Sequence, residues 1–130
     1  MKRMIPILLM MTLLTGCTAS NPVAEANTYR QITMQEAVEM MEKEENYIIL
    51  DVRTEQEYVV RHIPGAILIP NETIGTEEIP QLPEKDQLIM VYCRSGNRSK
   101  QASDKLVKLG YTNIVEFGGI INWPGEIVTD

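Results

Sequence analysis

Two different spacings of apolar residues alternate along the chain from residue 29 onward. Short runs rich in β-branched and aromatic side chains predict five strands. These strands are expected at residues 29–32, 47–52, 66–69, 88–92 and 113–117. The run at 88–92, Leu-Ile-Met-Val-Tyr, is apolar throughout, which is typical of a central strand buried on both faces.

Helix signals lie between these strands. The segments Thr-Met-Gln-Glu at residues 33–36 and Thr-Glu-Gln-Glu at 54–57 both have the spacing of a capping box. The first predicts a helix to about residue 43, and the second predicts a helix directly after the strand before it. A third helix is predicted over residues 98–109, with Gly110 as its stop.

Strands that alternate with helices predict an α/β fold, in which helices cover both faces of a central, mainly parallel sheet of about five strands. Binding sites in such folds form beyond the carboxyl ends of the strands. Asp51 and Cys93 both fall at strand ends of this kind. We therefore expect the functional site at that edge of the sheet.

The N-terminal residues follow neither spacing. Lys2 and Arg3 precede an apolar run over residues 4–14, which is typical of a secretory signal peptide and, at about a dozen residues, too short to span a bilayer. The sequence Leu-Thr-Gly-Cys at 14–17 resembles the bacterial lipobox, which predicts cleavage before Cys17 and acylation of that cysteine. A cleaved signal with an incidental Cys17, or an uncleaved anchor, are the alternatives. The lipobox reading places the protein outside the cytoplasm, anchored to a membrane.

The length of 130 residues fits one ordinary domain. We predict a signal peptide at 1–16, a lipidated cysteine with a flexible spacer at 17–27, and one folded domain at 28–130. The formal charge of −6 would become −8 after cleavage, which argues against nucleic acid as a partner. An anionic substrate must therefore be held by a local positive patch. No cofactor, metal site or obligate subunit interface is predicted, so we expect a monomer.

Cys93 begins the segment Cys-Arg-Ser-Gly-Asn-Arg-Ser, between the buried strand and the third predicted helix. Free amides at a helix start and the two arginines of the loop favour an anion and the nucleophilic thiolate form of a cysteine. Gly96 allows a positive φ or a close approach of the backbone. A lone cysteine after an apolar strand is often a buried structural residue. The residues after Cys93, however, are mostly polar or charged, which suits the edge of an anion-binding site better than a hydrophobic core.

Three segments, in this order and spacing, resemble the rhodanese family over about residues 29–128. They are Asp-Val-Arg at 51–53 with Glu-Tyr at 57–58 and His-Ile-Pro-Gly-Ala at 62–66, the loop at 93–99, and Gly-Gly at 118–119 followed by Trp123. The resemblance implies a rhodanese-like α/β fold. It also implies a sulfurtransferase that moves a sulfane sulfur from an anionic donor such as thiosulfate to cyanide or a thiol.

The resemblance assigns Cys93 as the catalytic residue, which would carry the sulfur as a persulfide. The loop amides would cradle that sulfur or the incoming anion, and they belong to Arg94, Ser95, Gly96, Asn97 and Arg98. The side chains of Arg94 and Arg98 are the charged groups placed to meet the donor. Asp51 and Arg53 resemble a structural ion pair of the family. His62 is implied to brace a turn, and Trp123 to pack in the core.

Two positions depart from the family pattern. Arg61 stands where glycine usually precedes the histidine, and Leu68 stands where asparagine is common. Two other functions remain open. Related phosphatases and arsenate reductases have five residues between the cysteine and the arginine, whereas Cys93 and Arg98 are separated by four. The domain could also be a module that binds a partner or stores a persulfide without turnover.

Overall fold

The computed structural model describes residues 27–130. Its elements, in chain order, are β1 (Arg30–Gln31), α1 (Met34–Lys43), β2 (Tyr47–Asp51), α2 (Glu55–Val60), β3 (Ile67–Leu68), η1 (Asn71–Thr73), β4 (Leu88–Cys93), α3 (Asn97–Lys108), β5 (Ile114–Gly119) and η2 (Ile120–Asn122). Every predicted strand and helix is present, with bounds that shift by one or two residues at some ends. The predicted signal peptide, Cys17 and most of the spacer lie outside the described residues.

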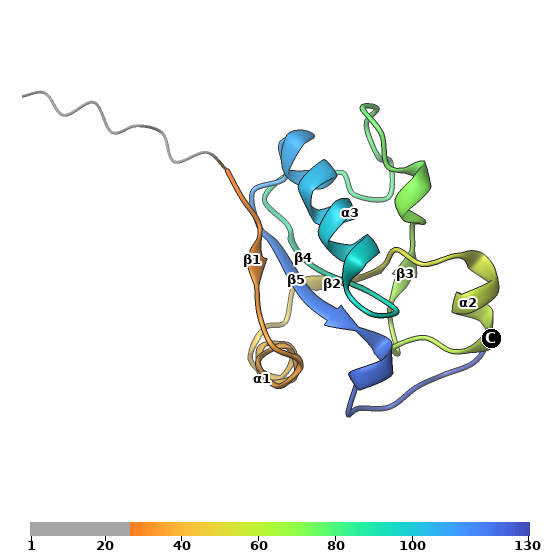
Figure 1. Cartoon of the computed structure of the whole chain (residues 1–130). Helices are drawn as coiled ribbons and strands as arrows, with labels where there is room; N and C mark the ends of the chain where they lie inside the picture. The colour runs from red at the N-terminus through yellow and green to blue at the C-terminus, as the bar shows by residue number, and fades with distance from the viewer. Residues whose placement is uncertain (1–26) are drawn as a thin grey trace, which may run out of the picture.

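The five strands form one parallel sheet in the order β1-β5-β4-β2-β3 (Figure 1). This arrangement confirms the predicted α/β fold class. The apolar strand β4 lies at the centre, as its sequence predicts, and β2 is its direct neighbour. Because parallel strands end at the same edge, Asp51 at the end of β2 and Cys93 at the end of β4 are brought to one side of the sheet.

Alternating residues of β4 divide the core into two parts. Val91 and Cys93 pack in the part that contains Leu106 of α3. Tyr92 packs in the other part, which contains Ala37 of α1. Figure 1 shows α1 and α3 on opposite sides of the sheet. Both faces are therefore covered, and the side chains of Tyr92 and Cys93 point into different halves of the core.

The helix starts follow from local sequence. Thr33 and Thr54 are the N-caps of α1 and α2, and both bonds of the predicted capping box are formed at each helix. Gly110 follows α3 with a φ of +98°, a conformation that ends helices and favours glycine. Within residues 27–130, no helix has the length and apolar character needed to cross a bilayer.

Candidate active site

The loop that carries Cys93 joins the central strand to α3. Cys93 is the last residue of β4 and is fully buried, and Gly96 is the N-cap of α3. Gly96 has a φ of +108°, which is the first of the two possibilities that a glycine at this position allows. Its amide donates a hydrogen bond of 2.9 Å to Cys93 Sγ. The sulfur therefore lies at the N-terminus of a helix, where amides and the helix dipole favour negative charge.

Two glycines of β5 let this loop lie close to the sheet. A Cβ atom at Gly119 would collide with the carbonyl group of Arg94 and the Cα of Ser95. Gly118 has a φ of +97°. The amide of Ile121 donates to the carbonyl oxygen of Arg94 over 3.3 Å. The path of the loop is thus set by a segment that follows it by more than twenty positions in the sequence.

A buried polar chain runs from Cys93 toward β5. Cys93 Sγ lies 3.4 Å from Ser99 Oγ, which in turn lies 2.7 Å from Glu116 Oε1. The Ser99 hydroxyl is also 2.9 Å from the carbonyl oxygen of Gly96, and the amide of Gly118 donates to Glu116 over 2.9 Å. Glu116 is only 3% exposed. This carboxylate ties the first turn of α3 to β5 directly behind the cysteine.

Glu116 is not among the site residues predicted from the sequence. The available signal is a charged residue inside an otherwise apolar strand, Ile-Val-Glu-Phe at residues 114–117. A charged side chain is rarely buried unless it is hydrogen-bonded, so its presence there indicates a partner in the fold. The identity of that partner, Ser99, depends on the packing of α3 against β5.

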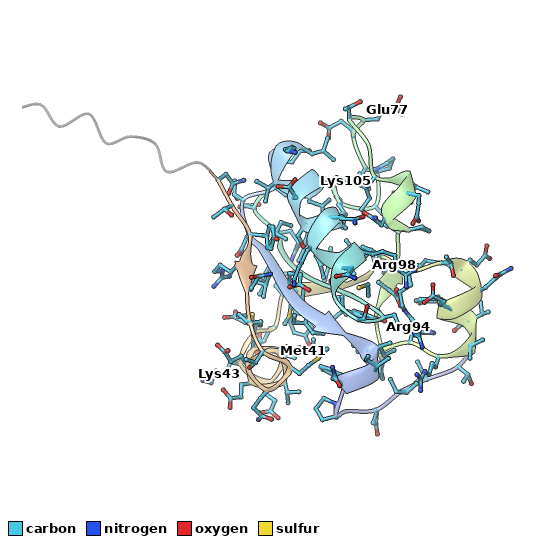
Figure 2. The ribbon with its side chains drawn as sticks, in the orientation of Figure 1. Met41, Lys43, Glu77, Arg94, Arg98 and Lys105 are labelled. Atoms are coloured by element: carbon cyan, nitrogen blue, oxygen red, sulfur yellow. The ribbon has the colours of Figure 1, made fainter. Side chains whose placement is uncertain are left out.

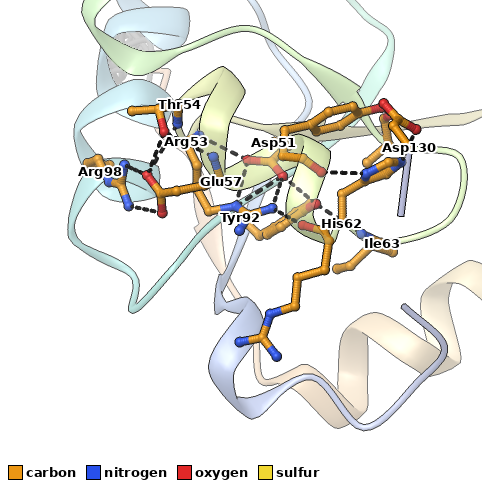
Figure 3. Close-up of polar contacts among 12 residues, drawn as sticks. Asp51, Arg53, Thr54, Glu57, His62, Ile63, Tyr92, Arg98 and Asp130 are labelled. Atoms are coloured by element: carbon orange, nitrogen blue, oxygen red, sulfur yellow. Dashed lines mark hydrogen bonds and ion pairs between the residues drawn. The ribbon is translucent and has the colours of Figure 1, made fainter. Parts of the chain in front are cut away.

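Arg98 is bound to α2 rather than turned toward the cysteine. Its guanidinium forms two hydrogen bonds to Glu57, of 2.7 and 3.0 Å (Figure 3). These bonds lower the pKa of Glu57 to about 2 and raise the pKa of Arg98. The same carboxylate closes the capping box with Thr54. Both oxygens of Glu57 are therefore engaged by Arg98, through its Nη1 and Nη2 atoms.

Arg94 has a different environment. It is exposed, and it lies with Arg98 on the side of the loop that faces α2 (Figure 2). Arg94 borders a surface pocket of about 530 Å³ together with residues of α2 and Ile120. No ion pair of Arg94 occurs within residues 27–130. Of the two arginines predicted to meet an anion, Arg94 is the one whose charge is free in this structure.

Asp51 and Arg53 form the predicted ion pair, at 2.6 Å, and both are buried (Figure 3). The Tyr92 hydroxyl donates to Asp51 over 2.6 Å and accepts from the amide of Ile63 over 3.2 Å. Arg53 also donates to the carbonyl oxygen of Arg61 over 2.7 Å. Burial, with the bond to Asp51, raises the pKa of Tyr92. This network joins β2, β4 and the end of α2 on the face of the sheet opposite Cys93.

His62 is buried at the turn that the resemblance implies it braces, whereas Trp123 is half-buried and packs against the core rather than inside it. His62 Nδ1 lies 2.8 Å from the carbonyl oxygen of Tyr58, and the two rings stack with centroids 3.7 Å apart. The backbone of His62 pairs with Val128, which fastens the C-terminal segment to the end of α2. Trp123 packs against Phe117 with ring centroids 5.8 Å apart.

Arg61, which stands where the family pattern has glycine, causes no backbone strain. Arg61 is the C-cap of α2 with a φ of −168°, which is extended backbone that any residue adopts. Its exposed side chain borders the same pocket as Arg94. Leu68, the second departure, is half-buried in β3.

The chemistry available to this site is that of a thiol at the N-terminus of a helix. Across the part of the chain that the structure describes, no three His, Cys, Asp or Glu side chains gather as metal ligands. Cys93 is the free cysteine there. The loop brings together Cys93, the amides of a helix start and Arg94. Arg98 instead pairs with Glu57, and Arg53 pairs with Asp51.

Comparison with known proteins gives one consistent family. The model of the rhodanese-like domain matches residues 33–125. The chain is 35% identical over 71 residues to thiosulfate sulfurtransferase PspE of Escherichia coli, a match that covers 55% of this chain and 68% of that protein. It is 31% identical over 113 residues to the probable adenylyltransferase/sulfurtransferase MoeZ of Mycobacterium tuberculosis, covering 85% of this chain but only 29% of MoeZ.

A solved structure agrees with these relatives. The rhodanese-like domain of the Alr3790 protein from Anabaena superposes with a TM-score of 0.70 at 27% identity, covering 79% of this chain and 81% of that one. The fold, the matched residues and the sulfurtransferase relatives point the same way. The chain belongs to the rhodanese-like family.

Proposed function

We propose that this protein is a sulfurtransferase in which Cys93 carries the transferred sulfur as a persulfide. The observation that carries the proposal is the amide of Gly96, which points at Cys93 Sγ from the N-terminus of α3. Sulfur transfer is the activity named for the relatives PspE and MoeZ. The donor, the acceptor and the roles of the individual residues are our assignment.

In the first half-reaction, the Cys93 thiolate attacks the outer sulfur of thiosulfate. A bond forms between Sγ and that sulfur, the sulfur–sulfur bond of thiosulfate breaks, and its electron pair leaves with sulfite. The new outer sulfur lies about 2 Å from Sγ and holds the negative charge. The amides of residues 94–98 and the dipole of α3 stabilise this charge where it develops.

In the second half-reaction, cyanide or a thiolate attacks the outer sulfur. The bond between that sulfur and Sγ breaks, and its electron pair returns to Cys93 as the thiolate. Because Cys93 is fully buried, the acceptor meets the outer sulfur rather than Sγ itself. Entry of the first donor requires the loop to open, since Sγ has no exposed surface.

Two features disfavour phosphate or arsenate chemistry at this loop. Four residues separate Cys93 from Arg98, which makes a tighter ring of amides than the five-residue loops of those enzymes. The guanidinium of Arg98, which could otherwise clamp a tetrahedral oxyanion, is bound through both arms to Glu57. A single terminal sulfur fits this arrangement better than a phosphate group.

The mass of the intact protein tests the proposal. After exposure to thiosulfate we expect a gain of one sulfur atom, which cyanide then removes as thiocyanate. A variant with Cys93→Ser should gain none. Loading that is followed by negligible turnover with every acceptor would favour the storage module instead. An unmodified mass after thiosulfate would contradict the persulfide mechanism.

We also propose that a lipid on Cys17 anchors the domain outside the cytoplasm. The support is the sequence Leu-Thr-Gly-Cys after a short apolar run. Replacing Cys17 with alanine should release the protein from membranes while sulfur transfer is retained, because a lipid chain supplies the attachment. Fractionation of cells that express the two forms measures this. Retention of Cys17→Ala in washed membranes would contradict lipidation.

A further inference from the structure

The pocket beside the Cys93 loop is larger than the proposed inorganic substrates require. It has a volume of about 530 Å³ and lies between α2, Arg94 and Ile120. Pockets of this size hold organic ligands of many atoms. Cyanide and thiosulfate, with two and five heavy atoms, would leave most of it filled with water. The pocket is therefore suited to an acceptor that has a carbon skeleton.

Two charged residues at this pocket are neutralised within the fold. Arg53 borders the pocket but pairs with Asp51 at 2.6 Å. Glu57 also borders it and pairs with Arg98 at 2.7 Å. Each of these pairs has a net charge of zero, so neither offers much attraction to a ligand.

Arg61 and Arg94 remain, and both are exposed. Neither has an ion pair within the stretch 27–130. The pocket therefore has two uncompensated positive charges in a chain whose formal charge is −6. Guanidinium groups bind carboxylates through directed, charge-assisted hydrogen bonds. This local reversal of charge favours a ligand with at least one carboxylate.

The pocket also has an apolar wall. Val60 borders it while remaining 66% exposed, and Ile120 of η2 also lines it, with 4% of its surface exposed. An exposed valine loses contact with water when an aliphatic chain covers it, which is favourable. A ligand with a few methylene groups and a carboxylate would use both the apolar wall and the arginines.

We propose that this pocket binds the sulfur acceptor, and that the acceptor is a small organic thiol that carries a carboxylate. Arg61 and Arg94 hold the carboxylate, and the methylene groups lie against Val60. Arg61 is then a specificity residue that selects the acceptor by charge. The inference rests on the proposed function, since the bound thiolate attacks the outer sulfur of the Cys93 persulfide and leaves with it, while the electron pair returns to Sγ.

The test uses protein that has been loaded with thiosulfate and freed of excess donor, so that only the acceptor half-reaction is observed. Single-turnover discharge is measured by mass with 3-mercaptopropionate, 2-mercaptoethanol and cysteamine, and each rate is divided by the thiolate concentration. We expect 3-mercaptopropionate to react about tenfold faster than 2-mercaptoethanol, and cysteamine to be slowest. Propionate should inhibit the first reaction competitively, and 1-propanol should not.

The Arg61→Gln variant should reduce the preference for 3-mercaptopropionate over 2-mercaptoethanol about tenfold, and Arg61→Lys should restore part of it. Lys43→Gln is the matched control, because it removes one positive charge on α1, away from Arg94 (Figure 2). The control should keep the preference of the parent protein. An equal effect of Lys43→Gln would mean that net charge alone steers the acceptor.

The outcomes separate this inference from the proposed function. Equal thiolate-corrected rates for the three thiols, with normal discharge by cyanide, would overturn the acceptor pocket and leave sulfur transfer standing. Failure of the parent protein to load or to discharge to cyanide would overturn the function itself. Faster discharge by an acidic cysteine peptide than by 3-mercaptopropionate, with the same dependence on Arg61, would overturn the choice of a small thiol.

Discussion

Tyr92 and Cys93 are neighbours in β4 but have opposite environments. Tyr92 is buried in a closed network, in which Asp51 accepts from both the Tyr92 hydroxyl and Arg53. Cys93 is equally buried but receives one amide hydrogen bond and a weak contact with Ser99 at 3.4 Å. Burial by itself therefore does not limit a polar residue to a structural role. What separates the two positions is whether their bonding capacity is fully used inside the fold.

The largest effect is expected from removing the thiol of Cys93. Replacing Cys93 with serine should abolish sulfur transfer, because serine is similar in size but far too weak an acid to carry a persulfide. The free energy of unfolding should change little. Steady-state thiocyanate formation and urea denaturation measure the two properties. Turnover above a few per cent of the parent would place the nucleophile elsewhere.

The next largest effect is expected from disrupting the buried network of Asp51, Arg53 and Tyr92. Replacing Asp51 with asparagine leaves the buried charge of Arg53 uncompensated, which should reduce the free energy of unfolding by about 3–5 kcal/mol. Urea denaturation measures the loss. Tyr92→Phe is the milder comparison, since it removes one hydroxyl and keeps the ion pair, at a cost of about 1 kcal/mol. Near-equal stabilities of the Asp51→Asn variant and the parent would contradict a structural role for this network.

A third prediction tests whether the length of the loop after Cys93 matters for sulfur transfer. Inserting one residue after Gly96 should displace the amide that points at Cys93, and a misplacement of about 1 Å can cost about a hundredfold in rate. Thiosulfate-to-cyanide transfer measures the loss, with hydrolysis of an aryl phosphate assayed in parallel. The parent protein should show negligible phosphatase activity. Sulfur transfer that is indifferent to the insertion would contradict selection by loop size.

The smallest effect concerns the ion pair that holds the loop helix to α2. Glu57→Gln removes the charge but keeps the capping box, and should cost about 1 kcal/mol at neutral pH. Because Arg98 lowers the pKa of Glu57 to about 2 from its usual 4.5, this stabilisation is present above pH 4.5 and is lost as the pH falls toward 2.

Urea denaturation of the parent and of Glu57→Gln over that pH range measures the difference. Glu55→Gln is the matched control, since Glu55 is an exposed residue of the same first turn without an ion pair in the described chain. A stability difference that stays constant with pH would show that the Arg98–Glu57 pair does not provide the stabilisation.

The elements themselves could be predicted from the sequence because their signals are local. The two Thr-x-x-Glu segments set the starts of α1 and α2 through contacts only three residues apart. The apolar run at 88–92 places β4 in the centre, and the position of Cys93 at its end follows from counting. The positive φ of Gly96 could be predicted for the same reason, since the turn lies within one short segment.

The partners within the site were decided by the tertiary structure. Glu57 pairs with Arg98, which is 41 positions away, because α2 and α3 meet beside the ends of β2 and β4. The resemblance implies that Arg94 and Arg98 both meet the anionic donor, and this packing places Arg98 in an ion pair. Periodicity along the chain carries no information about such contacts, which depend on the order of the strands in the sheet.

The same limit applies to Glu116, Gly119 and Arg61. Glu116 reaches Ser99 only because β5 lies next to β4, and Gly119 must be glycine because the backbone of Arg94 lies against it. Arg61 was visible as a departure from the family pattern, but its shared pocket with Arg94 was not. By itself the sequence determined the fold class and the position of the thiol. The fold decided which charges near that thiol are neutralised, because ion pairs form between residues that only packing brings together.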